Sequence, residues 1–80
     1  MPAAFTFYTT RWCGYCHRLK RQLHREGMTF DEVDIDADPE AAAIVAGVNG
    51  GDRTVPTLLF EDGSALTNPS VADVKSQLAS

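Results

Sequence analysis

The chain has 80 residues, of which 44% are hydrophobic and 22% charged. This length predicts one small domain over residues 1–80, and the composition excludes a disordered, collagen-like or coiled-coil protein. A formal net charge of -4 argues against a nucleic-acid partner, and no apolar run approaches the ~20 residues of a membrane-spanning helix. Residues 1–5 lack the basic and apolar regions of a secretory signal, so we expect a cytoplasmic protein with no membrane partner.

The first predicted elements are a strand and a helix. Residues 4–9 alternate and are rich in aromatic and β-favouring side chains, which is typical of a strand. Residues 14–26 place apolar side chains at helical spacing with charges on the remaining faces, and Gly27 marks the end of this helix. Residues 11–25 contain five basic residues and no acidic one, namely Arg11, Arg18, Lys20, Arg21 and Arg25.

A second strand and helix follow. Residues 29–35 favour a strand, and residues 39–46 predict a helix with Asp38 as its N-cap and Pro39 at its first position. Because a strand, helix and strand at this spacing form a right-handed crossover, the first two strands should be parallel.

The last third of the chain predicts a hairpin and a final helix. Residues 57–60 and 64–66 read as strands joined by a tight turn at 61–63, which implies an antiparallel pair. Residues 70–78 predict the last helix. The fold class is therefore α/β, ordered β-α-β-α-β-β-α, with a four-stranded mixed sheet flanked by three helices.

The strongest chemical signal is Cys13-Gly14-Tyr15-Cys16, between the first predicted strand and helix. A close cysteine pair in a cytosolic chain is more often redox-active or metal-binding than structural. Cys13 falls at the helix N-terminus, where unpaired backbone N–H groups and the helix dipole favour a negative charge. We therefore predict that the Cys13 thiolate attacks disulfides. Cys16 falls on the apolar side of the helix, so we predict that it is more buried and resolves mixed disulfides.

Three metal-binding interpretations share these residues. Zinc needs about four ligands, of which one C-x-x-C supplies half, and an iron–sulfur cluster would need thiols from outside the chain. Cys13-Gly14-Tyr15-Cys16-His17 also matches the C-x-x-C-H pattern of c-type haem attachment, which suits an exported chain. We expect no metal site. A non-catalytic haem or metal carrier that uses Cys13, Cys16 and His17 remains the alternative from a different class of protein.

Thr54-Val55-Pro56 stands directly before the third predicted strand. Proline is confined to the starts, edges or bulges of strands, and the residues alone favour an ordinary trans bond at a strand start. A cis bond would instead leave the Val55 backbone facing outward, where it could pair with an extended substrate.

These motifs and the order of elements together resemble the thioredoxin fold, specifically its glutaredoxin branch, over essentially the whole chain. The mycoredoxins are the most similar group, in residues 8–16, 31–35, 48–51, 53–57, 62–64 and 66–70. The resemblance implies a monomeric thiol–disulfide oxidoreductase that reduces protein–mycothiol mixed disulfides. It implies mycothiol as co-substrate, no bound cofactor, Cys13 as nucleophile, Cys16 as resolving cysteine, and Pro56 as a cis proline.

The stretch Thr67-Asn68-Pro69-Ser70 departs from many glutaredoxins, which carry two glycines and an acid-containing turn that hold glutathione. Neutral groups here would suit the sugar and inositol of mycothiol at least as well. We predict that the substrate groove is lined by Arg11, Trp12, Tyr15, Val55, Pro56, Asn68 and Ser70.

Two other oxidoreductases remain alternatives. One is a glutaredoxin that uses glutathione. The other is a redoxin reduced by thioredoxin reductase that serves ribonucleotide reductase. The chain lacks the aromatic Ser-Gly-Phe-like stretch that such redoxins carry near the last helix.

Overall fold

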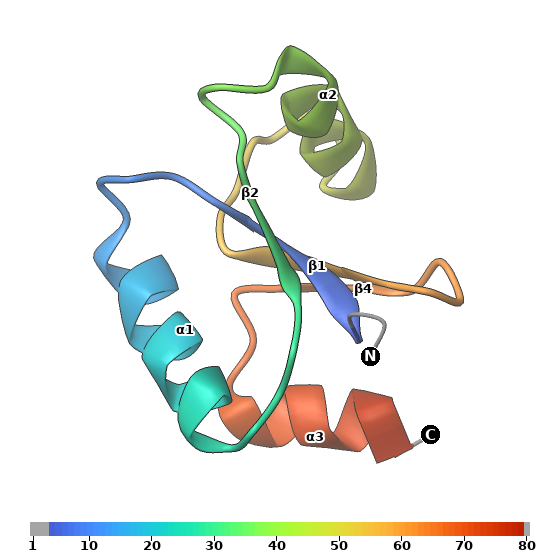
Figure 1. The fold of residues 1–80 in the computed structure, drawn as a ribbon. Helices are drawn as coiled ribbons and strands as arrows, with labels where there is room; N and C mark the ends of the chain where they lie inside the picture. Colours follow the sequence, from blue (N-terminus) through green and yellow to red (C-terminus); the bar gives the residue numbers. More distant parts are fainter. Residues whose placement is uncertain (1–3, 80) are drawn as a thin grey trace.

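The computed structural model describes residues 4–79, so residues 1–3 of the segment tested for a secretory signal lie outside it. Its seven elements follow the predicted order (Figure 1). They are β1 (Phe5–Thr9), α1 (Gly14–Arg25), β2 (Asp31–Asp34), α2 (Pro39–Val48), β3 (Thr57–Phe60), β4 (Ala65–Thr67) and α3 (Val71–Ala79). None of the helices in the described part of the chain is long and apolar enough to cross a membrane.

The four strands form one mixed sheet in the order β2-β1-β3-β4. β1 pairs with β2 in parallel and with β3 antiparallel, so that Phe7 lies opposite Glu32 on one side and Leu58 on the other. β3 and β4 form the antiparallel hairpin. Both the crossover and the hairpin predictions are therefore confirmed.

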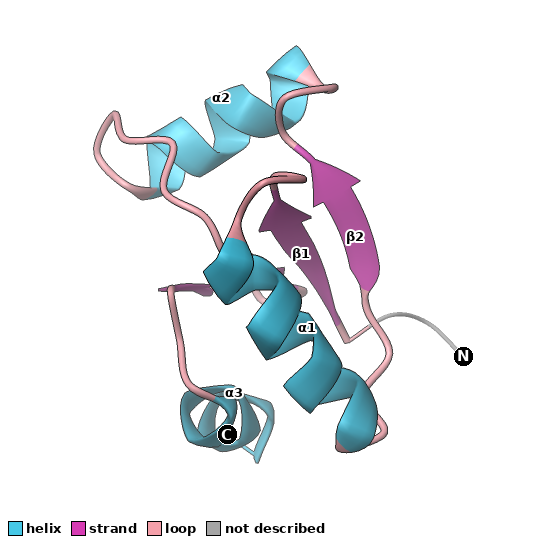
Figure 2. Cartoon of the chain, turned by 90° about the vertical axis from the view of Figure 1, so that its left-hand side faces the viewer, coloured by secondary structure: helices cyan, strands magenta, loops and turns pink. Residues whose placement is uncertain are grey.

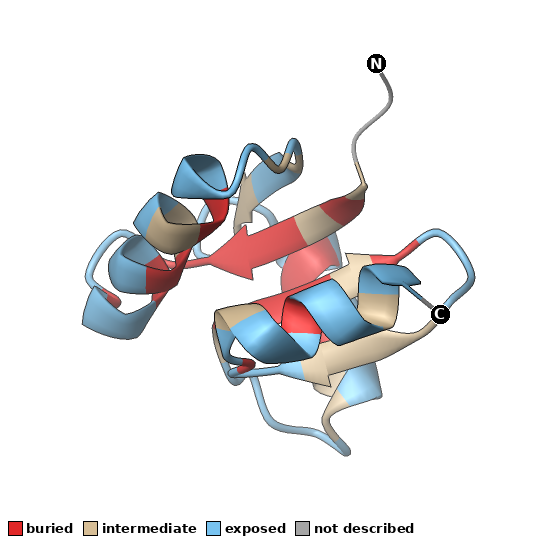
Figure 3. Ribbon diagram, turned by 90° about the horizontal axis from the view of Figure 1, so that it is seen from below, coloured by how far each residue is buried: buried red, intermediate tan, exposed pale blue. Residues whose placement is uncertain are grey.

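The helices cover both faces of this sheet. α1 and α3 lie on one face and α2 on the other (Figures 1 and 2). Buried residues line β1, β3 and the inward faces of the helices, while exposed residues cover the outer surfaces (Figure 3). Each face of the sheet has its own hydrophobic cluster, because side chains on a strand point alternately to opposite faces.

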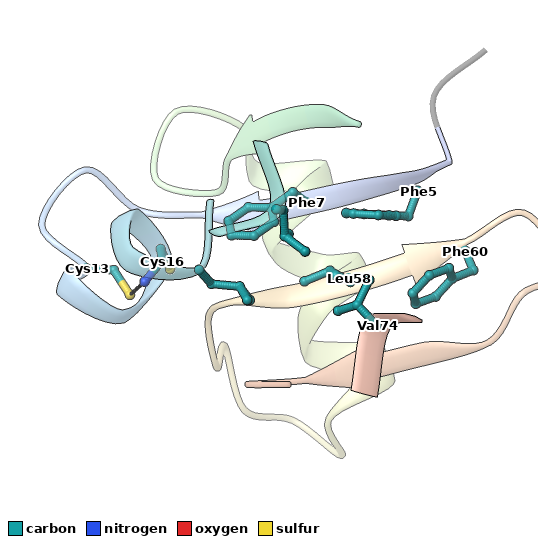
Figure 4. Close-up of a cluster of buried hydrophobic side chains, with 9 residues drawn as sticks. Phe5, Phe7, Cys13, Cys16, Leu58, Phe60 and Val74 are labelled. Atoms are coloured by element: carbon teal, nitrogen blue, oxygen red, sulfur yellow. Dashed lines mark hydrogen bonds between the residues drawn. The ribbon is translucent and has the colours of Figure 1, made fainter. Parts of the chain in front are cut away.

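The larger cluster lies between the sheet and helices α1 and α3 (Figure 4). It consists of Phe5, Phe7, Cys13, Cys16, Leu19, Leu23, Leu58, Phe60 and Val74. Both cysteines of the motif are thus part of the main core. The smaller cluster lies under α2 and consists of Tyr8, Ile35, Ala41, Ala42 and Val45.

Local side-chain and backbone bonds set the element ends where prediction and structure differ. The strand predicted over residues 29–35 is shorter, and the carbonyl of Thr29 accepts instead from the N–H of Ala4 at 3.0 Å. The helix predicted to end at residue 46 continues to Val48, where Asn49 caps it by donating from its backbone and side chain to the carbonyl of Val45.

Candidate active site

Cys13 is the N-cap residue of α1, with extended backbone angles of φ -82 and ψ 106. Its Sγ accepts a hydrogen bond from the backbone N–H of Cys16 at 3.1 Å (Figure 4). The sulfur thus takes the place usually held by a Ser, Thr, Asp or Asn oxygen at a helix start. The first turn of α1 contains no acidic residue, so no carboxylate there competes for the positive end of the helix dipole.

Cys16 lies one turn further along the helix and is more deeply buried, with 1% of its surface exposed against 6% for Cys13. Both cysteines are free thiols. Burial, together with the hydrogen bond to Cys13, raises the pKa of the Cys16 thiol to about 11. Cys16 therefore remains protonated at neutral pH.

Two side-chain contacts hold the loop before Cys13. The Nε2 atom of His17 is hydrogen-bonded to the carbonyl of Arg11 at 2.8 Å. The indole N–H of Trp12 donates to the carboxylate of Asp36 at 3.1 Å. The Trp12 ring is nevertheless 76% exposed, and Tyr15 is 71% exposed. Large exposed aromatic side chains therefore lie beside the cysteine pair.

A groove runs between α1 and the start of α3. It has a volume of about 440 Å³ and is lined by Tyr15, Arg18, Leu19, Gln22, Asn68, Ser70, Val71 and Ala72. Asn68 has a positive φ of 48°, and its N–H donates to the carbonyl of Pro56 at 2.7 Å, which fixes this loop next to the proline. Three of the predicted groove residues, Tyr15, Asn68 and Ser70, thus lie along one surface.

The remaining predicted groove residues lie elsewhere around the cysteine pair. Arg11 lines a different pocket of about 240 Å³, and its Nε lies 3.9 Å from a carboxylate oxygen of Asp34. Val55 packs against both hydrophobic clusters, Pro56 is buried, and the Val55–Pro56 bond is cis, as the resemblance implies. Trp12 reaches toward Asp36 at the end of β2.

Sequence reasoning missed Arg18 and Gln22 as groove residues. The spacing of three and seven residues from Tyr15 places them on the same face of α1, and this helical spacing is the signal that could have found them.

The start of α3 is capped from within. The backbone N–H of Ser70 donates to the carboxylate of Asp73 at 3.0 Å, and the N–H of Asp73 donates to the hydroxyl of Ser70 at 3.1 Å. This reciprocal pair satisfies two backbone donors and places a negative charge at the edge of the groove.

Within residues 4–79, no three or more His, Cys, Asp or Glu side chains are grouped so that they could hold a metal ion. His17, the third residue of the metal-carrier alternative, is instead bonded to the Arg11 carbonyl.

The cysteine pair follows the first strand of a four-stranded mixed sheet, with one thiol at the start of a helix and the other one turn further along it. This arrangement defines a thiol–disulfide oxidoreductase of the thioredoxin fold. The glutaredoxin family model matches residues 5–64. The chain belongs to the glutaredoxin family.

Curated relatives agree with this family. The chain is 58% identical to a Mycobacterium tuberculosis protein named as a glutaredoxin, covering 98% of this chain and 93% of that protein. It is 45% identical to Mycoredoxin 1 of Corynebacterium glutamicum, covering 86% of this chain and 85% of the relative. Proteins of this family act with low-molecular-weight thiols and protein disulfides, and they use a thiol co-substrate rather than a bound cofactor.

Solved structures show the same fold. A glutaredoxin from Archaeoglobus fulgidus superposes with a TM-score of 0.80 at 22% identity, covering 98% of this chain and 88% of that one. A buckwheat glutaredoxin–glutathione complex matches with a TM-score of 0.69 at 25% identity, covering 92% of this chain and 69% of that one.

Proposed function

We propose that this protein reduces protein–mycothiol mixed disulfides, with Cys13 as nucleophile and mycothiol as electron donor. The proposal places residues 1–80 in one domain that works as a cytoplasmic monomer. It is supported by the position of Cys13 at the start of α1 and by the 45% identity to Mycoredoxin 1.

The reaction follows from the two cysteine environments. The Cys13 thiolate attacks the mycothiol sulfur, a Cys13–mycothiol disulfide forms, and the protein thiolate leaves and takes up a proton. A second mycothiol thiolate then attacks the mycothiol sulfur of this disulfide, which releases mycothiol disulfide and the Cys13 thiolate. In the alternative branch Cys16 attacks Cys13 and releases mycothiol, and the resulting internal disulfide is reduced by further mycothiol.

The observation that carries the choice of thiol is the internally capped start of α3. Because Ser70 and Asp73 satisfy each other's backbone N–H groups, those donors are not available to the carboxylate of a γ-glutamyl group. The hydroxyl groups of a sugar and inositol need no positive charge, and Asn68 and Ser70 offer them neutral donors and acceptors.

The test compares kcat/KM for a protein mixed disulfide made with each thiol, using the same thiol as reductant. A missing hydrogen bond to a charged group costs roughly 1.5–3 kcal/mol, so glutathione should be on the order of tenfold to a hundredfold poorer than mycothiol. Equal values for the two thiols would make this protein a glutathione-dependent glutaredoxin. Faster reduction by thioredoxin reductase than by either thiol would assign it to the redoxins that this enzyme reduces.

A further inference from the structure

The outer face of α1 carries a row of arginines. Arg18, Arg21 and Arg25 follow one another at spacings of three and four residues, so they lie on one face of the helix. The buried residues of α1 lie on the opposite face. All three arginines are exposed, and no other element of residues 4–79 covers this side of the helix (Figure 2). We call these three residues the arginine row.

The arginine row has no acidic partner within residues 4–79. α1 itself contains no acidic residue. Lys20, on another face of the helix, pairs with Glu32 of β2, and Glu26, directly after the helix, pairs with Lys75 of α3. The charges of the row are therefore available to a molecule that binds from solution.

The row begins beside the proposed nucleophile. Gly14 directly follows Cys13 and lies on the same face of α1 as Arg18, four residues before it. A Cβ at Gly14 would meet no atom within 4 Å beyond its chain neighbours and its own helix backbone, so the path from Cys13 to the row is open. At a rise of ~1.5 Å per residue, Arg18 and Arg25 lie about 8 and 18 Å along the helix axis from Cys13. An extended chain at ~3.3 Å per residue covers these distances in roughly two to six residues.

An acidic segment of a protein fits this surface. Arginine binds carboxylates through paired hydrogen bonds, and unpaired charges of one sign speed association with a partner of the opposite sign. A nucleic acid fits less well, because the chain's 11 acidic residues all lie from Glu26 onward and would repel a polyanion that extends beyond the row. The net charge of -4 favours basic partners, so the row and the whole molecule predict opposite preferences.

We propose that the arginine row binds acidic segments of substrate proteins, so that mixed disulfides with Asp or Glu about two to six residues from the modified cysteine are reduced preferentially. The inference names a substrate class for Cys13 and rests on the proposed function. The row acts on association, while the exchange of thiols at Cys13 is the same as for an uncharged substrate. It thus determines specificity and takes no part in the chemical step.

The test compares three short peptides that differ only in charge. Each contains one cysteine joined to mycothiol in a mixed disulfide and carries Glu, Gln or Lys at the neighbouring positions, either before or after the cysteine. The measured quantity is kcat/KM with mycothiol as reductant, at low and at high ionic strength. At low ionic strength we expect the Glu peptide to exceed the Gln peptide by about tenfold in at least one of the two arrangements. High salt should reduce this preference to about twofold, because it screens exposed charges.

Two double variants remove the same net charge from different places. Arg21→Gln with Arg25→Gln removes two charges of the row, and both positions lie outside the groove between α1 and α3. We expect this variant to lower the preference for the Glu peptide to about twofold and to leave kcat/KM for the Gln peptide unchanged. Lys20→Gln with Arg53→Gln removes two charges elsewhere and should keep the preference of about tenfold.

Equal kcat/KM values for the Glu and Gln peptides in both arrangements would overturn the inference. The same loss of preference in the two double variants would also overturn it, because net charge would then be the cause. A preference for the Lys peptide would have the same meaning. Stronger inhibition by a short DNA duplex than by a cysteine-free Glu peptide would assign the row to nucleic acid instead. If the protein reduces none of the peptides, the proposed function itself is contradicted.

Discussion

Two chemically identical side chains, three positions apart, have different surroundings because only one of them stands at a helix start. The sulfur of Cys13 accepts the N–H of Cys16, whereas the sulfur of Cys16 faces the core. The position of Cys13 at the helix start and the deeper burial of Cys16 were predictable from the C-x-x-C spacing and its place between a strand and a helix.

At the scale of single residues we predict opposite outcomes for the two cysteine variants. Cys13→Ser should lose all activity because it removes the capping sulfur that attacks the disulfide. Cys16→Ser should retain much of its activity on small mixed disulfides, because the route through a single cysteine needs only Cys13. The measurement is turnover of a small mixed disulfide with excess thiol. An active Cys13→Ser protein would contradict the assignment, and equal losses in both would mean that every turnover needs both sulfurs.

At the scale of elements, each segment was predictable from periodicity and capping residues, but their ends and meeting points were not. Asp38 accepts from the N–H groups of Glu40 and Ala41, as expected for the N-cap of α2. By contrast, the groove joins α1 to the loop before α3, and no local pattern indicates that Arg18 lies near Asn68. For the same reason Arg11 was expected in this groove but lines another pocket.

The cap of α2 offers a test of how firmly this helix is held. Asp38→Ala removes the acceptor of two backbone N–H groups and should lower the free energy of unfolding by about 1 kcal/mol. Urea unfolding followed by circular dichroism measures this change. Asp52→Ala, in an exposed loop, removes the same charge without a cap and should change stability by a few tenths of a kcal/mol at most. Equal losses in the two variants would point to charge rather than capping.

At the scale of the whole molecule, the sheet separates two buried ionisable groups. Cys16 lies in the cluster under α1 and α3, and Tyr8 lies in the cluster under α2. Burial raises the pKa of both groups, with Asp38 adding to the effect at Tyr8. The two faces of the fold therefore share one property, which is that the folded state holds protons that the unfolded chain releases at lower pH.

This shared property predicts a loss of stability in alkaline solution. Above pH 9 the Cys16 thiol of the unfolded chain ionises, while that of the folded protein remains protonated until about pH 11. The folded state then binds more protons than the unfolded state, so the free energy of unfolding falls as pH rises through this window.

The measurement is the urea midpoint at pH 7, 9 and 10.5 with a reductant present. We expect no loss from Cys16 below pH 8 and a fall on the order of 1 kcal/mol by pH 10.5, since one pKa unit corresponds to ~1.36 kcal/mol. Cys16→Ala should flatten the slope just above pH 9, even if it lowers stability at every pH by opening a small cavity. Tyr8→Phe should flatten only the more alkaline part, because tyrosine ionises at higher pH. A slope unchanged in both variants would show that other groups cause the alkaline loss.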